Sequence, residues 1–396
     1  MHARVAPSSL YLTVACNASL TLQEQVPPLP DSEEEAEGKA AHWVAMRYAA
    51  GYGRELPVGA KFISEGRQWE VDLDMVLGAT MYNNAMGGYN TFLRLEQGVA
   101  IPRVHNTECT GTPDGFIFYP SYTFPPEVRA ADPSLPSRPI KLLRVGEYKY
   151  GHRFVEVFEN YQMGSYASGV MNLLQLTDND PDLYLELVLV QPRSYHRDGP
   201  VRVWRGEAHM IRAIINIAHG AAERALMPNP EARTSEHCID CKARHLCKTL
   251  QYATQTFIDF STSPELVELP PEAMGQELML VDEAIARLEA RRTGLAAQAE
   301  ALLRQGKAVA FYHMEAGQSR MIYRDDVDVD EVVGLGELLG IDLRKPQTKK
   351  EMLITPKQAI DVGVDPDVMK KYAFRPPAAQ KLTRDSSITA RKVFSK

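Results

Sequence analysis

A succession of short apolar strands and helices between residues 114 and 225 constrains the fold of this chain more than any other feature. The segment 184–191 is strongly apolar and of strand length, too short for a buried helix. Similar patterns predict further strands at 114–119, 140–148 and 201–204, with helices at 160–174 and 207–225. Strands interleaved with helices predict an α/β fold in which helices flank a mixed central sheet.

The segments around this region differ in character. Ser32 followed by Glu35 forms a capping box, which predicts a helix that ends near Ala50. Residues 120–139 are rich in proline and are predicted to be a surface insertion. Residues 276–304 carry apolar side chains at three-four spacing, which predicts a long helix that either packs on the chain or forms a coiled coil. We therefore expect a main domain at 1–255, a long amphipathic helix at 270–306 and a small mixed C-terminal module at 307–396.

Composition excludes several classes of protein. The chain has 396 residues, of which 44% are hydrophobic and 24% charged, as in globular proteins. No apolar run is long enough to span a membrane, and the first residues lack the pattern of a signal peptide. A cytoplasmic location is therefore expected, in the host cell if a phage encodes the chain. The net charge of −7 argues against blanket binding of nucleic acid but allows a local basic groove.

The most informative polar residues lie at the ends of two predicted strands. Asp114 opens one strand, while Glu147 and Lys149 stand near the end of another. Side chains two apart on a strand share a face, so Glu147 can hold a divalent metal while Lys149 orients the attacking water. Such an arrangement suits phosphodiester hydrolysis. Tyr148 points away, but its backbone carbonyl is a further candidate ligand. The alternative is a surface hairpin whose charges face solvent.

Five cysteines suggest a metal site, because disulfides are rare in the cytosol. Cys238, Cys241 and Cys247 are spaced as ligands of one centre, and the fourth ligand must come from elsewhere. Cys16 is the natural candidate and Cys109 the competitor, although Cys109 is expected to be a small buried filler. An iron–sulfur cluster held by thiolates and a structural zinc site that uses His237 or His245 are both open.

Two further motifs complete a pattern. His42 lies on the capped helix, and Gln162 and Tyr166 are four apart on a predicted helix, so they share one face. The order His, Asp, Glu-x-Lys, Gln-x-x-x-Tyr resembles the RecB-type branch of the PD-(D/E)XK nucleases. The single N-terminal cysteine followed by C-x2-C-x5-C resembles the [4Fe–4S] staple of AddB-like members. Further stretches, including 36–42 and 111–114, resemble a family of phage and prophage exonucleases long described only as a domain of unknown function.

This resemblance implies a fold, a cofactor set and roles for individual residues. The fold implied is a restriction-endonuclease-like core closed by an iron–sulfur cluster, followed by a helical extension. The implied metal is Mg²⁺ or Mn²⁺. The implied catalytic residues are Asp114, Glu147, Lys149, Gln162 and Tyr166; the metal ligands are His42, Asp114, Glu147 and the Tyr148 carbonyl; the cluster ligands are Cys16, Cys238, Cys241 and Cys247. Gln162 and Tyr166 are also expected to place DNA.

The resemblance implies an exonuclease of phage recombination or replication that acts on free DNA ends. Its expected partner is a phage single-strand-binding or annealing protein, and a homo-oligomer is compatible with the long helix. Arg144 and Arg153 belong to a set of basic residues that either line a DNA path or form a solvated face. The other members of this set are Lys141, His152, Arg193, Arg197 and Arg202. Two other functions remain open: a catalytically silent DNA-binding or end-capping subunit, and a zinc-stabilised structural or interaction protein.

Overall fold

The computed structural model describes residues 3–27, 32–88, 90–194, 198–261, 271–316, 322–324, 327–341, 343, 353, 355–361, 363–375 and 380–384. The chain divides into two compact units, Met1–Gly294 and Leu295–Lys396, and the division falls within one long helix. Among the described residues, no helix combines the length and apolar character needed to cross a bilayer.

A five-stranded mixed sheet forms the centre of the first unit, in the order β3-β6-β7-β8-β9. Its strands are β3 (Arg94–Leu95), β6 (Gly115–Tyr122), β7 (Ile140–Tyr148), β8 (Leu183–Val190) and β9 (Val201–Glu207). β6 and β7 are antiparallel, β7 and β8 are parallel, and β8 and β9 are antiparallel. The predicted α/β class with a mixed sheet flanked by helices is therefore confirmed.

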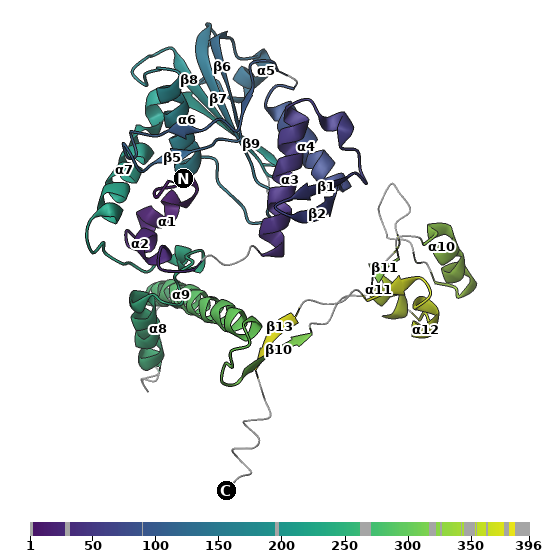
Figure 1. Cartoon of the computed structure of the whole chain (residues 1–396). Coiled ribbons are helices and arrows are strands. Elements are labelled where there is room, and N and C mark those ends of the chain that lie inside the picture. The colour runs from purple at the N-terminus through teal and green to yellow at the C-terminus, as the bar shows by residue number, and fades with distance from the viewer. Residues whose placement is uncertain are drawn as a thin grey trace. The chain divides into compact units, whose positions relative to one another are not determined.

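Helices cover both faces of this sheet, as Figure 1 shows. One face carries α1 (Leu10–Ala15), α2 (Ser19–Gln23), α6 (Tyr161–Leu173) and α7 (Arg212–Leu226), while the other carries α3 (Glu33–Ala49), α4 (Leu73–Ala85) and the hairpin of β1 (Lys61–Ser64) and β2 (Arg67–Glu70). Every residue of β8 is buried, as expected of a strand covered on both faces. Each face therefore has its own hydrophobic core.

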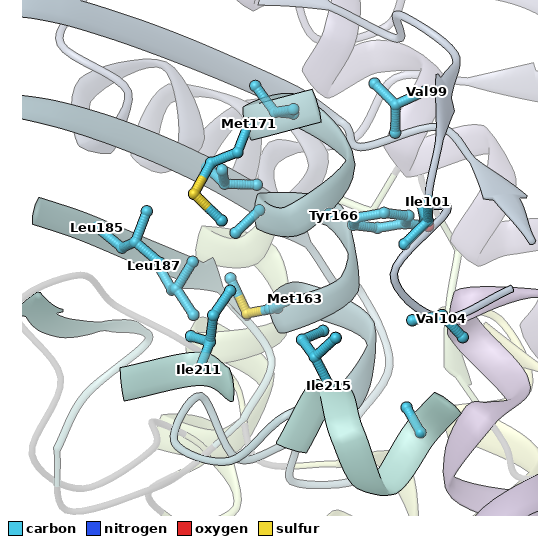
Figure 2. Close-up of a cluster of buried hydrophobic side chains, with 14 of the residues drawn as sticks. Val99, Ile101, Val104, Met163, Tyr166, Met171, Leu185, Leu187, Ile211 and Ile215 are labelled. Atoms are coloured by element: carbon cyan, nitrogen blue, oxygen red, sulfur yellow. The ribbon is translucent and has the colours of Figure 1, made fainter. Parts of the chain in front are cut away.

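The core on the α6 side depends on small residues within that helix. Residues 163–171 are all buried, and the helix is inserted between the sheet and the short strand β4 (Val99–Ala100). A Cβ on Gly169 would lie 2.7 Å from Val99 Cγ2, so only glycine permits this approach. Figure 2 shows Met163 and Met171 of α6 against the β8 residues Leu185 and Leu187. The absence of a side chain at Gly169 thus sets how closely α6 approaches β4.

Helix starts follow the predicted local chemistry. The Ser32 side chain accepts from the Glu35 N–H, and the Glu35 carboxylate accepts from the Ser32 N–H, which confirms the capping box of α3. The Asn160 side chain accepts from the Met163 N–H and caps α6. Short helical turns complete the first unit: η1 (Pro7–Ser9), η2 (Gly53–Glu55), α5 (Pro126–Ala131), η3 (Ala208–Ile211) and η4 (Glu236–Ile239), together with the strand β5 (Thr110–Gly111), which pairs with β4.

The proline-rich insertion at 120–139 contains regular secondary structure. β6 continues into it as far as Tyr122, and α5 follows. The register of β6 against β7 shifts between Tyr119 and Tyr122, around Pro120, which lacks the N–H that a regular ladder needs. Phe124 and Leu135 are buried in a small core with strand residues. The first residues of the insertion therefore extend the sheet, while most of the others are exposed or half-buried, as predicted for a surface insertion.

The long helix behaves differently from the expectation of a packed apolar stripe. It spans Pro271–Arg304 as α9, after α8 (Lys248–Ser261). Leu278, Val281 and Ile285 are about half exposed, at 60%, 44% and 47%. In the first unit, α9 instead contacts residues 234–247, the cysteine segment, through polar and small residues. Arg287 donates to Thr234 Oγ1, and a Cβ on Gly294 would meet Arg244.

The second unit contains short elements. Its helices are α10 (Val329–Leu338), α11 (Pro356–Asp361) and α12 (Pro366–Met369), and its strand pairs are β10 (Tyr312–Ala316) with β13 (Gln380–Arg384) and β11 (Ile322–Tyr323) with β12 (Ala373–Phe374). Val332, Leu343 and Met369 belong to its small hydrophobic core.

Candidate active site and cysteine pocket

The antiparallel pairing of β6 and β7 brings the predicted acidic residues together. Gly115 pairs with Gly146, so Asp114 lies beside Glu147 although the two are far apart in sequence. The Tyr148 N–H donates to Asp114 Oδ2 at 2.7 Å and fixes the orientation of that carboxylate. Both carboxylates are buried, with exposed fractions of 8% for Asp114 and 4% for Glu147. Two buried acidic side chains therefore lie together at one end of the central strands, where β6 begins and β7 ends.

His42 reaches the same place from α3. Its Nε2 lies 3.0 Å from Asp114 Oδ1. Burial lowers the pKa of His42, but the hydrogen bond and charge of Asp114 outweigh this effect and the net shift is upward. The helix that the capping box starts at Ser32 thus delivers an imidazole to the acidic pair.

Lys149, Gln162 and Tyr166 complete a connected network around Glu147. Lys149 Nζ lies 2.6 Å from Glu147 Oε1, and Gln162 Nε2 donates to the same oxygen at 2.7 Å. Lys149 also donates to Gln162 Oε1 at 3.2 Å, and Gln162 Nε2 lies 3.2 Å from the Tyr166 hydroxyl. The four-residue spacing of Gln162 and Tyr166 on α6 therefore points both side chains into this network.

The environment of Glu147 disfavours its charged form. Burial and the neighbouring Asp114 raise the pKa of Glu147 to about 7, against the opposing effect of Lys149. Its second oxygen, Oε2, is buried without a hydrogen-bond partner among the described residues. Burial lowers the pKa of Lys149, but Glu147 raises it and the net shift is upward. A buried carboxylate oxygen that has no hydrogen-bond partner and lies near a second carboxylate is a ligand that a cation would satisfy.

Tyr82 is a site residue that the sequence analysis missed. It comes from α4, is fully buried, and its hydroxyl has no hydrogen-bond partner among the described residues. A Cβ at Gly115 or Gly146 would lie 2.8 or 3.2 Å from this hydroxyl, so the two glycines make room for it. The glycines that adjoin Asp114 and Glu147 were the available signal, because each allows a close approach to the backbone.

The basic residues predicted to contact DNA lie elsewhere. Arg144 is on the opposite face of β7 from Glu147, where it pairs with the buried Glu186 and packs over Tyr119. Arg153 is exposed and pairs with Asp240 in the cysteine segment. Among the other basic candidates, Lys141, Arg193 and Arg202 have protein partners, and Arg197 lies outside the described residues.

Four of the five cysteines line one pocket. Cys16 follows α1, whereas Cys238, Cys241 and Cys247 lie in and after η4, and all four face the same space. Cys109, the competitor for the fourth position, is buried in the main hydrophobic core instead, as expected of a filler. Tertiary folding therefore brings the two distant parts of the first unit together at these thiols.

Backbone N–H groups converge on this pocket. Cys16 Sγ accepts from Arg233 at 3.4 Å, Cys238 Sγ from Ser235 at 3.3 Å and Cys247 Sγ from Leu250 at 3.4 Å. Burial, together with the neighbouring cysteines, raises the pKa of Cys241 to about 11. Thiols crowded in this way favour a cation, which would stabilise their deprotonated form.

The two histidines considered for zinc are not equivalent. His237 lines the cysteine pocket, and its Nδ1 is buried without a partner among the described residues. His245 does not line that pocket, and its carbonyl accepts from Arg291 of α9. The zinc alternative therefore rests on His237.

The donor sets fit different cations. In the part of the chain that the structure describes, no three His, Cys, Asp or Glu side chains are already arranged around a metal position. The buried carboxylates nevertheless provide hard oxygen ligands, of which Glu147 Oε2 is unsatisfied, and His42 adds an imidazole nitrogen. The four thiols provide soft donors suited to iron–sulfur or zinc.

Comparison with known proteins identifies a family for this chain. A family model described as "Protein of unknown function (DUF2800)" matches residues 139–359, more than half of the chain. The match includes Glu147, Lys149 and the cysteines of residues 238–247, but begins after His42 and Asp114. No curated protein matches the chain.

Proposed function

Because this chain belongs to the DUF2800 family, a family of proteins of unknown function, its activity has to be argued from its own residues, and we propose that it is a metal-dependent DNA exonuclease. One observation carries the proposal: Asp114, Glu147 and Lys149 converge at a buried sheet edge, where Glu147 Oε2 lacks a partner. A buried acidic pair costs stability, and a role in binding a cation explains why the fold keeps it.

The residues of the site have separable roles in hydrolysis. Asp114, Glu147 and His42 would hold Mg²⁺ or Mn²⁺, with the Tyr148 carbonyl as a further ligand. The ion, when bound, polarises the phosphoryl oxygen and lowers the pKa of a water molecule. Lys149 holds a positive charge beside that water and orients it. Gln162 fixes the Glu147 carboxylate and the Lys149 ammonium relative to one another through its two contacts.

We extend the proposal to the type of fold and to the cofactor of the cysteine pocket. We assign the mixed sheet that bears Asp114 and Glu147 to the PD-(D/E)XK type. Cys16, Cys238, Cys241 and Cys247 fit a [4Fe–4S] cluster that ties the two ends of the nuclease domain together. The unpartnered His237 Nδ1 supports the alternative of zinc. An absorption band near 400 nm together with iron, or zinc without that band, separates the two.

The experiment is digestion of end-labelled linear single- and double-stranded DNA, beside a closed circle, with Mg²⁺ or Mn²⁺. We expect linear DNA to be degraded from its ends and the circle to persist. Glu147→Ala and Lys149→Ala should abolish cleavage while the fold and metal content of the cysteine pocket remain. Glu207→Gln, which changes an exposed carboxylate of the same sheet, is the matched control and should cleave normally.

Two results would contradict the proposal. Cleavage retained by both site variants would remove the assigned roles. Binding of DNA ends without cleavage in any divalent metal would identify the chain as a silent end-capping subunit instead.

A further inference from the structure

Helix α9 carries an exposed stripe of mainly apolar residues at the spacing of a coiled coil. The stripe comprises Leu278, Val281, Ile285, Leu288, Arg292 and Leu295, and its alternating steps of three and four residues run from 274 to 302. All six side chains are exposed. A repeat that lasts for about four heptads is long enough to favour a coiled coil. The α9 stripe is therefore a seam on which a second helix can pack.

The contacts of α9 with the cysteine segment lie on another side of the helix. Ala290 is fully buried, Arg287 donates to Thr234 Oγ1, and a Cβ on Gly294 would meet Arg244. At about 3.6 residues per turn, positions 287, 290 and 294 face away from the stripe. A second helix can therefore pack on the stripe without displacing the cysteine segment.

The spacing of the stripe fits a second copy of α9 that runs in the opposite direction. From Leu278 to Leu295 the steps are three, four, three, four and three residues, so their order is the same from either end. An antiparallel copy therefore places Leu278 opposite the second copy's Leu295, and Ile285 opposite the second copy's Leu288. Val281 then lies opposite the second copy's Arg292.

Arg292 favours the antiparallel direction over the parallel one. In a parallel pair, equivalent positions meet, so two Arg292 guanidinium groups would face each other in an apolar seam and repel. In the antiparallel pair, Arg292 lies beside Asp282 of the second copy, because Asp282 follows Val281. Both side chains are exposed, and neither has an ionic partner among the residues that the structure describes. The two copies therefore complement each other in charge as well as in apolar spacing.

We propose that the chain forms a homodimer in which two copies of α9 pair as an antiparallel coiled coil. The stripe forms its apolar seam, and Arg292 of each copy pairs with Asp282 of the other. A twofold axis relates the two pairs, as a closed dimer requires. The inference is independent of the proposed nuclease activity, since no stripe residue belongs to the candidate active site.

Ile285→Asp tests the centre of the seam in the full-length protein. Sedimentation equilibrium should give twice the mass of one chain for the wild type. The variant should dimerise at least about tenfold more weakly, because it places a charge against the second copy's Leu288. Met279→Asp is the matched control: Met279 is an exposed apolar residue of α9 outside the stripe, so this variant should dimerise as the wild type does. Circular dichroism and the metal content of the cysteine pocket should be the same in all three proteins.

Exchange of the two charges tests the direction of pairing. Arg292→Asp and Asp282→Arg should each weaken dimerisation at least about tenfold, because each brings like charges together twice in the dimer. The double variant, which carries both substitutions, should dimerise more tightly than either single variant. In a parallel pair the double variant would not recover, since two aspartates would still meet at position 292.

Three results would overturn the proposal. A wild type that stays monomeric at every concentration would leave the stripe to a helix of another protein. Dimerisation that Ile285→Asp does not weaken would place the interface elsewhere on the chain. A double charge variant that dimerises no more tightly than the single variants would exclude the antiparallel pairing.

Discussion

Glu147→Gln should make the metal-free protein more stable while it abolishes catalysis. The carboxylate is 4% exposed, and burial with the charge of Asp114 raises its pKa from the usual 4.5 to about 7. Above pH 7, folding must keep this group ionised in an environment that disfavours the charge. An uncharged amide of the same shape keeps the oxygen that Gln162 and Lys149 contact. The substitution therefore removes the unfavourable charge and little else.

The magnitude follows from the pKa shift. A shift from 4.5 to about 7 corresponds to about 3 kcal/mol of destabilisation when the group is ionised. The attraction between Lys149 and the ionised carboxylate is already included in this pKa, so its loss needs no separate deduction. We expect a gain of about 3 kcal/mol, or a rise in Tm of about 6–12 °C.

The stability difference between Glu147→Gln and the wild type should depend on pH. Because the folded state holds the Glu147 proton more tightly than the unfolded state, stability falls as pH rises from about 4.5 through about 7. The gain from Glu147→Gln should therefore be absent below pH 4.5 and full above pH 7. The assay is thermal unfolding of both proteins between pH 4 and pH 9 in a chelator, with exposed Glu207→Gln as control.

Added metal should make the wild type more stable than Glu147→Gln, the reverse of the order expected in chelator. Mg²⁺ or Mn²⁺ that binds only the folded site raises the Tm of the wild type with the logarithm of the metal concentration once the site is saturated, and Glu147→Gln should respond far less. A variant that is less stable than the wild type at pH 8 in chelator, together with a wild type that metal does not stabilise, would refute the reasoning.

Three further results are expected. Cys16→Ser should lose the metal of the cysteine pocket, measured by elemental analysis, whereas Cys109→Ser should retain it because Cys109 lies in the core. Arg144→Ala should lower Tm by several degrees, because it leaves the buried Glu186 with one cationic partner fewer, while kcat/KM of the folded protein stays unchanged. Gly169→Val should cost at least about 1–3 kcal/mol in chemical denaturation, because even its Cβ would lie 2.7 Å from Val99 on β4.

Local chemistry made several elements predictable. The limits of β7 match the apolar segment at 140–148, and the capping box places the start of α3 after Ser32. The four-residue spacing of Gln162 and Tyr166 correctly predicted a shared helix face. Strand alternation also predicts the placement of Arg144 relative to Glu147: the two are three apart on β7, so they point to opposite faces.

Long-range contacts decided the rest of the candidate site. Tyr82 had no motif, and its place beside Asp114 and Glu147 depends on how α4 packs against the sheet. The apolar spacing of α9 predicted a packed stripe, but that helix contacts the cysteine segment through Arg287 and Gly294. Such outcomes depend on packing partners that no local pattern specifies.

Sequence alone determined several elements, including β7 and the start of α3, which side chains share a face and which cysteines are spaced for one centre, because these properties depend on neighbours along the chain. Only the tertiary structure decided that His42 meets Asp114 and that Cys16 rather than Cys109 joins the other thiols. Each of these contacts joins residues that are distant in sequence, and the register of the sheet and the packing of helices on its two faces set them.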